Sequence, residues 1–263
     1  MTEAKTLEGH HALVTGAGSG IGAATARALA MAGARVSLAG RRRRPLEQVA
    51  ETIPSGAAIA IDGFDVTSEA EVARGFERAR AAFGPVTMVV NNAGEAPSAS
   101  FEKTDPGLWA RVLAVDLTGV YLVSRAALAD LKARGTGARL INIASTAGLI
   151  GYAYVSAYCT AKHGVVGLTR ALALELARTG VTVNAVCPGF TDTPLVDHAV
   201  KTIVAKTGRS EGDARTGLTK KNPQGRLVRP EEVADAVLWL ASPGAAAING
   251  QAIVVAGGEV MAG

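Results

Sequence analysis

The sequence predicts an α/β protein: one doubly wound domain with a parallel sheet of about seven strands and helices on both faces. Short runs rich in Val, Ile, Leu and Ala alternate with longer Ala-rich segments of helical spacing, which is typical of βαβ units. The runs are continuously apolar, as expected when helices cover both faces of a sheet. They lie at residues 11–15, 35–39, 57–61, 86–90, 139–144, 181–186 and 252–256. Because no Pro/Gly/Ser-rich linker or internal repeat divides them, we expect residues 1–263 to form one domain.

The composition fits one large globular core and argues against several other classes of protein. Of the 263 residues, 48% are hydrophobic and only 4% are aromatic, which indicates a core of Ala, Val, Leu and Ile. The formal net charge of +4 is too small to favour a nucleic-acid partner. Cys159 and Cys187 are too few for a disulfide framework and suit a reducing compartment. The first residues are polar where a signal peptide is apolar, and no apolar run approaches about 20 residues, so we expect a soluble, cytoplasmic protein with no membrane partner.

A glycine-rich turn follows the first apolar run. Residues 15–22 read TGAGSGIG, and a helical segment over residues 21–34 follows at once. Backbone amides at the start of such a helix bind a pyrophosphate well, because they are unpaired and point out of the helix end. The glycine spacing differs from the usual G-x-G-x-x-G, so a tight strand-to-helix turn without a ligand is the alternative.

Four arginines, Arg41 to Arg44, follow the second apolar run. NAD-binding proteins usually place an acidic residue at the end of this strand to hold the ribose hydroxyls, whereas this chain has Gly40 and then Arg41. A guanidinium binds a 2′-phosphate through paired, charge-assisted hydrogen bonds. We therefore expect NADP(H) as the preferred cofactor, with NAD(H) as the alternative. Arg43 and Arg44 are expected to be the solvated start of the next helix.

Ser145, Tyr158 and Lys162 form a set suited to hydride transfer between a carbinol carbon and a nicotinamide. Such a transfer needs a group that gives or takes a proton at the oxygen. Lys162 lies four residues after Tyr158, on the same helix face, and a cation at about 4 Å with a dielectric constant near 20 contributes about 4 kcal/mol, or about three pKa units. Ser145, thirteen residues before Tyr158, would donate to the carbonyl oxygen. Without that serine, Y-x-x-x-K would suggest only an amphipathic helix.

The order and spacing of several motifs resemble the short-chain dehydrogenase/reductase family. Besides the glycine turn and YCTAKHG, these are NNAG (residues 91–94), NIASTAG (residues 142–148), NAVCPGFTDTP (residues 184–194) and VVAGG (residues 254–258). The closest resemblance is to bacterial 3-oxoacyl-thioester and polyketide ketoreductases. It implies a Rossmann-type fold, an oxidoreductase acting on a ketone or secondary alcohol, and a homotetramer, or at least a dimer, that pairs through the helices over residues 108–131 and 157–177.

The resemblance also implies roles for individual residues. Tyr158 and Lys162 would contact the cofactor as well as act in catalysis, and no metal is expected. The other residues expected to bind cofactor are Gly16, Ser19, Gly20, Ile21 and Gly22 in the glycine turn, Arg41, Asp65 and Val66 near the adenosine, Asn91, Ala93 and Gly94 after the fourth strand, and Pro188, Gly189, Thr191 and Thr193 near the carboxamide. For the last four, ordinary turn chemistry is the alternative.

Asp116 departs from the family pattern. The family usually has an asparagine here, which holds a water in the proton relay behind the lysine. An aspartate keeps the acceptor and loses the amide donor. If ionised, Asp116 would pair with Lys162 through water and partly offset the effect of the lysine on Tyr158. We count Asp116 among the catalytic residues.

The substrate is the least constrained feature. Residues 190–229 interrupt the alternation with polar and turn-forming residues, which predicts a substrate lid. Between Asp192 and Asn222 the segment carries six lysines and arginines against four acidic residues, a surplus that would attract the phosphate of coenzyme A or a carrier protein or would simply be solvated. We expect a 3-oxoacyl or 3-hydroxyacyl thioester. The alternatives are a cyclic, steroid or sugar alcohol, or a catalytically silent dinucleotide-binding sensor.

Overall fold

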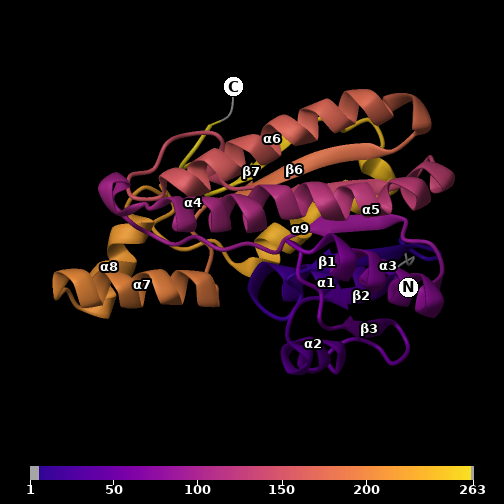
Figure 1. The fold of residues 1–263 in the computed structure, drawn as a ribbon, viewed down its shortest axis with the longest axis horizontal. Coiled ribbons are helices and arrows are strands. Elements are labelled where there is room, and N and C mark those ends of the chain that lie inside the picture. Colours follow the sequence, from indigo (N-terminus) through magenta and orange to yellow (C-terminus); the bar gives the residue numbers. More distant parts are fainter. Residues whose placement is uncertain (1–5, 262–263) are drawn as a thin grey trace.

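Seven parallel strands form one sheet in the computed structural model, which describes residues 6–261 (Figure 1). The strands are β1 (His11–Thr15), β2 (Arg35–Ala39), β3 (Ala58–Ile61), β4 (Met88–Asn91), β5 (Arg139–Ile143), β6 (Thr182–Pro188) and β7 (Ala252–Val255). Their order across the sheet is β3-β2-β1-β4-β5-β6-β7, with every neighbouring pair parallel. The predicted α/β fold, with a single seven-stranded parallel sheet, is confirmed.

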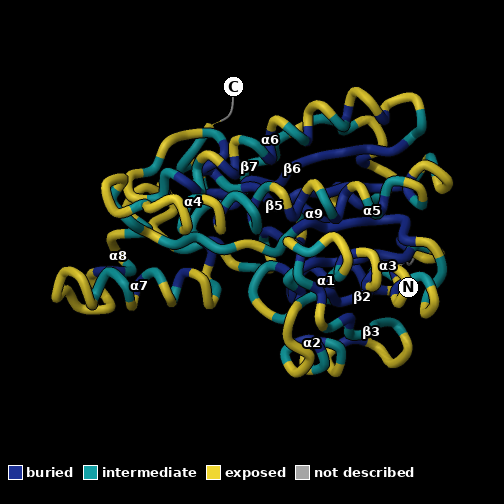
Figure 2. The backbone as a smooth tube through the Cα atoms, in the orientation of Figure 1, coloured by how far each residue is buried: buried dark blue, intermediate teal, exposed yellow. Residues whose placement is uncertain are grey.

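Helices cover both faces of the sheet and bury its five inner strands, whereas the edge strands β3 and β7 are partly exposed (Figure 2). The helices are α1 (Gly20–Met31), α2 (Arg43–Ala50), α3 (Glu69–Phe83), α4 (Pro106–Leu113), α5 (Gly119–Arg134), α6 (Ser156–Leu176), α7 (Pro194–Thr207), α8 (Glu211–Thr219) and α9 (Pro230–Ala241). Apolar residues of α1, α2 and α9 form one core layer against the strands, and those of α3, α5 and α6 form another. The continuous apolar character of the strands follows from this double coverage.

The helices α4 and α5 are joined end to end by a π-helical turn, Ala114–Thr118. The combined helix, Pro106–Arg134, contains an 18-residue window with a mean hydropathy of 1.6, so its length and composition alone would suit a membrane span. Arg111, Asp116 and Arg125 interrupt this helix, so it holds no uninterrupted apolar run of that length. Val112, Val123 and Leu131 on this helix are fully buried in the protein, which shows that the apolar side belongs to the core.

The chain changes direction across the sheet between β1 and β4, the two strands from which it winds outward in opposite senses. At their carboxyl ends the Thr15 hydroxyl accepts hydrogen bonds from the backbone N–H groups of Asn92 (2.9 Å) and Ala93 (3.0 Å). The Asn92 side chain in turn donates to the Thr15 carbonyl oxygen at 2.9 Å. Open parallel sheets bind ligands at such a switch point, so the site is expected at this edge.

Residues 190–229 project from the carboxyl edge as an arm made of α7 and α8 (Figure 1), with much of its surface exposed (Figure 2). The base of the arm is closed by a parallel bridge between Thr191 and Val228. Farther out, Arg215 of α8 pairs with Asp192 and Asp197. The polar stretch that breaks the strand–helix alternation is therefore helical and ordered around its own ion pairs.

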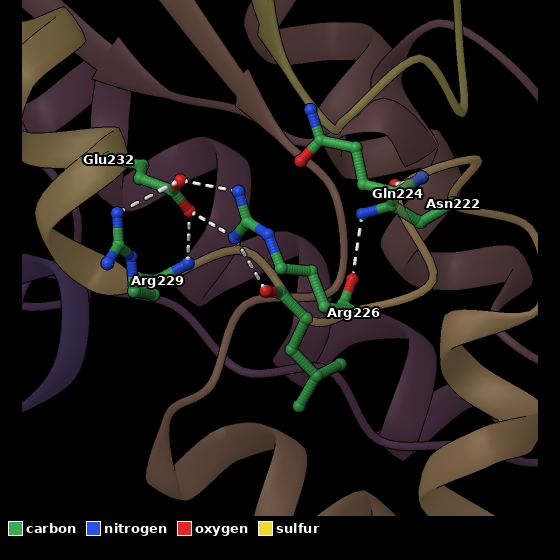
Figure 3. A network of polar contacts seen from close by, with 6 residues as sticks. Asn222, Gln224, Arg226, Arg229 and Glu232 are labelled. Atoms are coloured by element: carbon green, nitrogen blue, oxygen red, sulfur yellow. Dashed lines mark hydrogen bonds and ion pairs between the residues drawn. The ribbon is translucent and has the colours of Figure 1, made fainter.

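The chain returns from the arm to α9 through a network of polar contacts (Figure 3). The Glu232 carboxylate accepts from both terminal nitrogens of Arg226 (2.6 and 2.7 Å) and from the backbone N–H of Arg229 (2.8 Å). The Asn222 side chain donates to the Arg226 carbonyl oxygen at 2.8 Å. The hydrogen bonds from Arg226 and from the Arg229 backbone lower the pKa of Glu232 to about 2. Glu232 thus stays ionised at neutral pH and fixes the arm to the first turn of α9.

Candidate active site

A cavity of about 1140 Å³ lies at the carboxyl edge of the sheet, between the glycine turn and the arm. All but two of the site residues expected from sequence line it. The lining set comprises Gly16, Ser19, Gly20, Ile21, Arg41, Asp65, Val66, Ala93, Gly94, Asp116, Ser145, Tyr158, Lys162, Pro188, Gly189, Thr191 and Thr193. The sheet brings these distant residues together because every strand is parallel and ends at the same edge.

Ser145, Tyr158 and Lys162 all line this cavity. Ser145 follows β5 and is the N-cap of a 3-10 turn, Thr146–Gly148, and its hydroxyl oxygen accepts from the Ala147 N–H at 3.1 Å. Tyr158 and Lys162 lie one turn apart on α6, with the Lys162 Nζ 5.5 Å from the centre of the Tyr158 ring. The hydroxyl, the phenol and the ammonium group therefore face one space, as the spacing in the sequence predicted.

Asp116 pairs directly with Lys162. Its Oδ1 lies 3.2 Å from the Lys162 Nζ, and the ammonium group also donates to the Ile143 carbonyl oxygen at 3.1 Å. Asp116 is fully buried within the π-helical turn. π-helical turns inside α-helices occur frequently at functional sites. The sequence predicted a pair through water, so the direct contact is a correction: the carboxylate itself reaches the ammonium group.

Gly94 makes room for this ion pair. A Cβ atom at Gly94 would lie 2.6 Å from the Asp116 Oδ1, closer than real Cβ atoms approach other atoms. The following residue, Glu95, donates its backbone N–H to the Asp116 carboxylate at 3.2 Å. The NNAG motif thus contributes the absence of a side chain at its last position, and the Asp116 carboxylate is held from two sides.

Burial and neighbouring charges together shift the pKa values of Tyr158 and Lys162. Burial raises the pKa of the Tyr158 phenol, Lys162 lowers it, the Asp116 carboxylate raises it again, and the net direction is upward. Burial lowers the pKa of the Lys162 ammonium group, but the Asp116 and Tyr158 oxygens outweigh that effect and the net direction is also upward. Lys162 thus lowers the pKa of Tyr158 as the sequence predicted, but desolvation of the phenol, which was not predicted, is the larger contribution.

The start of α1 is built to receive an anion. Its N-cap residue, Ser19, has an extended backbone and a side chain that caps no amide, and its first turn holds no acidic residue. By contrast, Ser68, Asp105 and Ser210 cap α3, α4 and α8 with their side chains. Gly16 and Gly20 have φ values of 64° and 52°, which glycine adopts without strain. The uncapped amides and the helix dipole therefore fit the pyrophosphate of a dinucleotide.

The arginine run divides as the sequence predicted. Arg41 and Arg42 line the cavity at the end of β2, and Arg44 is exposed outside its lining. Arg43 forms an ion pair with Glu47 one helical turn later, with 2.6 Å between Nε and Oε1. Asp65 lies on the same side of the cavity, and hydrogen bonds from the Thr67 backbone and side chain, with the charge of Arg41, lower its pKa against the effect of burial. Two guanidinium groups are thus available where the second ribose of a dinucleotide would lie.

Two expected cofactor residues do not line the cavity. The Asn91 side chain points into the protein and donates to Ser124 (3.0 Å) and Asn142 (2.9 Å), and its neighbour Asn92 lines the cavity instead. The two asparagine side chains differ because successive residues at a strand end point to opposite faces. Gly22 is a packing residue, since a Cβ there would lie 2.4 Å from the Gly16 carbonyl oxygen.

Several residues that line the cavity were not found from the sequence. Asn92 is the residue that forms hydrogen bonds with Thr15. Glu95 forms an ion pair with Arg111 of α4, with 3.0 Å between Oε1 and Nε. Tyr152 and Phe190 form part of the wall beside Ser145, and Leu195 and Ile203 of α7 line the side formed by the arm. The repeated asparagine of NNAG was a usable signal for Asn92. The others depend on which face of a loop or helix turns inward, which the sequence does not show.

The comparisons with known proteins identify the class. Residues 10–203 match the family model for short chain dehydrogenases, so the chain belongs to this family. It is accordingly an oxidoreductase that acts on CH–OH groups.

Among its relatives, a protein of Streptomyces coelicolor that is named a ketoacyl reductase is 42% identical over 96% of this chain and 98% of its own length. The cis-4-hydroxycyclohexanecarboxylate dehydrogenase of Sinomonas cyclohexanicum is 43% identical over 94% and 95% of the two chains. A variant of actinorhodin polyketide ketoreductase, crystallised with NADPH, superimposes with a TM-score of 0.89 at 39% identity, covering 95% of this chain and 97% of that chain. The resemblance to polyketide ketoreductases is therefore confirmed.

The direct Asp116–Lys162 pair predicts a change in the pH dependence of alcohol oxidation in an Asp116→Asn variant. Removing the carboxylate charge stabilises the Tyr158 phenolate, so the pKa of Tyr158 falls and the alkaline-side rise of the oxidation rate moves to lower pH. The measurement is the oxidation rate against pH for both proteins. Glu102→Gln, the same charge change at an exposed position outside the cavity lining, is the control and should leave the profile in place. An unshifted profile for Asp116→Asn would exclude tuning by charge.

Proposed function

We propose that this chain is an NADP(H)-dependent ketoreductase whose catalytic residues are Ser145, Tyr158, Lys162 and Asp116. The observation that carries the proposal is that one cavity joins Ser145, Tyr158 and Lys162 to the uncapped start of α1. A dinucleotide with its pyrophosphate at that helix end would extend toward the three catalytic side chains. The chemistry that the cofactor supplies when bound is the donation or acceptance of a hydride.

In the direction of reduction, the Tyr158 hydroxyl gives its proton to the substrate oxygen while the carbonyl carbon gains the hydride. Ser145 donates a hydrogen bond to the same oxygen and fixes its position. Lys162 stabilises the phenolate that forms, and Asp116 holds the ammonium group in place from the buried side. The raised pKa of Tyr158 supports this direction, because the phenol then keeps its proton at neutral pH.

For the cofactor, the support is Arg41 and Arg42 at the end of β2, where an acidic residue would select NAD(H). The actinorhodin ketoreductase variant, with its NADPH, agrees with that choice. Cofactor residues outside the cavity centre are proposed from the lining: Asp65 and Val66 for the adenine side, and Pro188, Gly189, Thr191 and Thr193 for the carboxamide side.

For the substrate, we propose a 3-oxoacyl or 3-hydroxyacyl thioester bound beneath residues 190–229 acting as a lid. The names of the ketoacyl and polyketide relatives support it. The role of residues 190–229 as a lid is supported by Lys206 of α7, which lines the cavity and donates to the Ser98 carbonyl oxygen across it at 3.2 Å. A cyclic secondary alcohol is the second candidate, favoured by the cyclohexanecarboxylate dehydrogenase among the relatives. Because Cys159 and Cys187 are both free thiols, we propose that the protein works in the cytoplasm.

The cofactor proposal predicts that wild type uses NADPH better than NADH and that Arg41→Asp reverses the preference. Loss of a charge-assisted pair and the added repulsion should lower kcat/KM for NADPH by about 10- to 100-fold. The measurement is kcat/KM for both cofactors. Arg44→Asp, the same substitution at an exposed arginine outside the cavity, is the matched control and should retain the preference. A wild type that favours NADH would contradict the proposal that these arginines select NADP(H).

The catalytic proposal predicts that Tyr158→Phe lowers turnover by at least about 10²-fold, as expected when a general acid is lost, while NADPH binding persists. Absorbance at 340 nm follows turnover across a panel of 3-oxoacyl-CoA thioesters, cyclic ketones, steroid ketones and sugars, and NADPH fluorescence follows binding. Highest kcat/KM on the thioesters supports that substrate class. If wild type converts no compound of the panel, the catalytically silent sensor is favoured. An active Tyr158→Phe enzyme would overturn the assignment of the proton donor.

We propose a homotetramer, or at least a dimer, that pairs through α5 and α6. Tyr121 on α5 is 46% exposed and Leu174 on α6 is 82% exposed, so these helices keep apolar side chains on their outer surfaces. Light scattering at micromolar concentration should give the mass of an oligomer, and Leu174→Asp should lower it. A monomeric wild type would contradict the proposal.

A further inference from the structure

Tyr152 has hydrogen bonds that form a directed chain beside the catalytic serine. Its hydroxyl oxygen lies 2.7 Å from the Glu259 Oε1 and 2.9 Å from the Thr146 Oγ1. The Glu259 carboxylate can only accept, so Tyr152 donates to Glu259 and accepts from the Thr146 hydroxyl. Burial raises the pKa of the Tyr152 phenol and the Glu259 carboxylate raises it further, against the opposing effect of Thr146. The phenol therefore keeps its proton, and the direction of the chain is fixed.

At one end of this series of hydrogen bonds, Thr146 belongs to the turn that follows Ser145. Thr146 directly follows Ser145 and begins the turn Thr146–Gly148. The other side of that turn packs closely on α6, since a Cβ at Gly148 would lie 2.7 Å from the Lys162 carbonyl oxygen. The turn is thus held between α6 and the Tyr152 hydroxyl. The Tyr152 hydroxyl thus contacts the residue that directly follows Ser145.

The ring of Tyr152 contacts both ends of the arm. Phe190, at the start of the arm, meets the ring edge to face, with 6.1 Å between the ring centres and an angle of 89°. Lys221, after α8, places its Nζ 4.8 Å from the ring centre. The two ends are also joined to each other, because the Val228 N–H donates to the Phe190 carbonyl oxygen at 2.9 Å. One aromatic ring therefore packs against the departing and the returning segment of the arm.

The C-terminal segment completes the arrangement. Glu259 follows β7, and its Oε2 lies so near Gly189 that a Cβ there would be 2.9 Å from it. Gly189, which directly precedes Phe190, therefore leaves room for the carboxylate. The Tyr152 hydroxyl and ring together contact four separated parts of the chain through Thr146, Phe190, Lys221 and Glu259.

We propose that Tyr152 is a positioning residue that couples the position of the arm, residues 190–229, to the placement of the Ser145 hydroxyl. The ring follows the two ends of the arm, and the hydroxyl transmits that position to the serine turn through Thr146. Small displacements of a reacting group have large effects on rate, so this coupling would make full activity depend on a closed arm. The inference rests on the proposed catalytic role of Ser145.

A double-mutant cycle tests whether Tyr152 acts through Ser145. Tyr152→Phe keeps the ring and removes the hydroxyl, and we expect kcat to fall about tenfold, the effect of one hydrogen bond that holds a reacting group. The Kd for NADPH, measured by fluorescence, should stay within about twofold, because the cofactor contacts are unchanged. In a Ser145→Ala background the same substitution should lower kcat no further. The substrate is the carbonyl compound of the panel that wild type reduces fastest. Thr52→Val, which also removes one hydroxyl hydrogen bond but lies outside the cavity lining, is the control and should leave kcat unchanged.

The outcomes of this cycle are distinct. Losses that multiply in the double variant, or a Tyr152→Phe variant with unchanged kcat, would overturn the inference while leaving the proposed function intact. A Ser145→Ala variant as active as wild type would instead overturn the catalytic assignment, and the inference with it. Glu259→Gln, which keeps an acceptor for the phenol, should lose less activity than Glu259→Ala, whereas equal losses would contradict the hydrogen-bonded chain.

Limited proteolysis tests the other half of the coupling. Removal of the ring in Tyr152→Leu should increase thermolysin cleavage within residues 190–229 several-fold, because both ends of the arm lose a packing partner. Tyr152→Phe keeps the ring and should be cleaved as slowly as wild type. If Tyr152→Leu does not fold, Lys221→Met removes the contact at the returning end and should also speed cleavage. Equal cleavage of wild type and of the variants that lack these contacts would overturn the link between the ring and the arm.

Discussion

The buried ammonium group of Lys162 is the constraint on which the rest of the site depends. An unpaired charge in the interior costs several kcal/mol, so the protein must supply it with partners. Asp116 and the Ile143 carbonyl oxygen are those partners. To bring the carboxylate within reach, the helix between α4 and α5 forms a π-helical turn, and Gly94 has no side chain where Asp116 needs space. The motif glycine and the helical irregularity both accommodate one ion pair.

That ion pair changes how the proton of Tyr158 is controlled. A lysine beside a phenol lowers the pKa of the phenol, but a carboxylate behind the lysine opposes that effect, and burial of the phenol opposes it more strongly. The net result is a neutral phenol, which is the form that carbonyl reduction needs. An asparagine in place of Asp116 would leave the positive charge of Lys162 less compensated. The departure from the family pattern at Asp116 thus bears on the balance between proton donation and proton acceptance.

The sheet and most of the cavity could be predicted from the sequence because their signals are local. Each apolar run becomes a strand, and parallel strands must end at one edge, so residues that follow the strands meet there. The exchange between Asn91 and Asn92 was not predictable, since it depends on the residue at which β4 ends and on the face to which each side chain turns. The direct contact of Asp116 with Lys162 also required coordinates, because it depends on the π-helical turn. Tyr152 and Glu259 lie 107 residues apart, and no spacing pattern relates them.

The division of the molecule into a packed sheet and an exposed arm gives Tyr152 its significance. Tyr158 and Lys162 lie on α6, and Ser145 lies in the turn just after β5, beside the densely packed core. The arm has few buried side chains and much exposed surface, and such segments open at a lower cost in free energy than the core (Figure 2). A site assembled from both parts needs a contact that links the position of the arm to that of the core residues. Tyr152 meets that requirement, because its ring packs on the arm while its hydroxyl binds the turn that carries the serine.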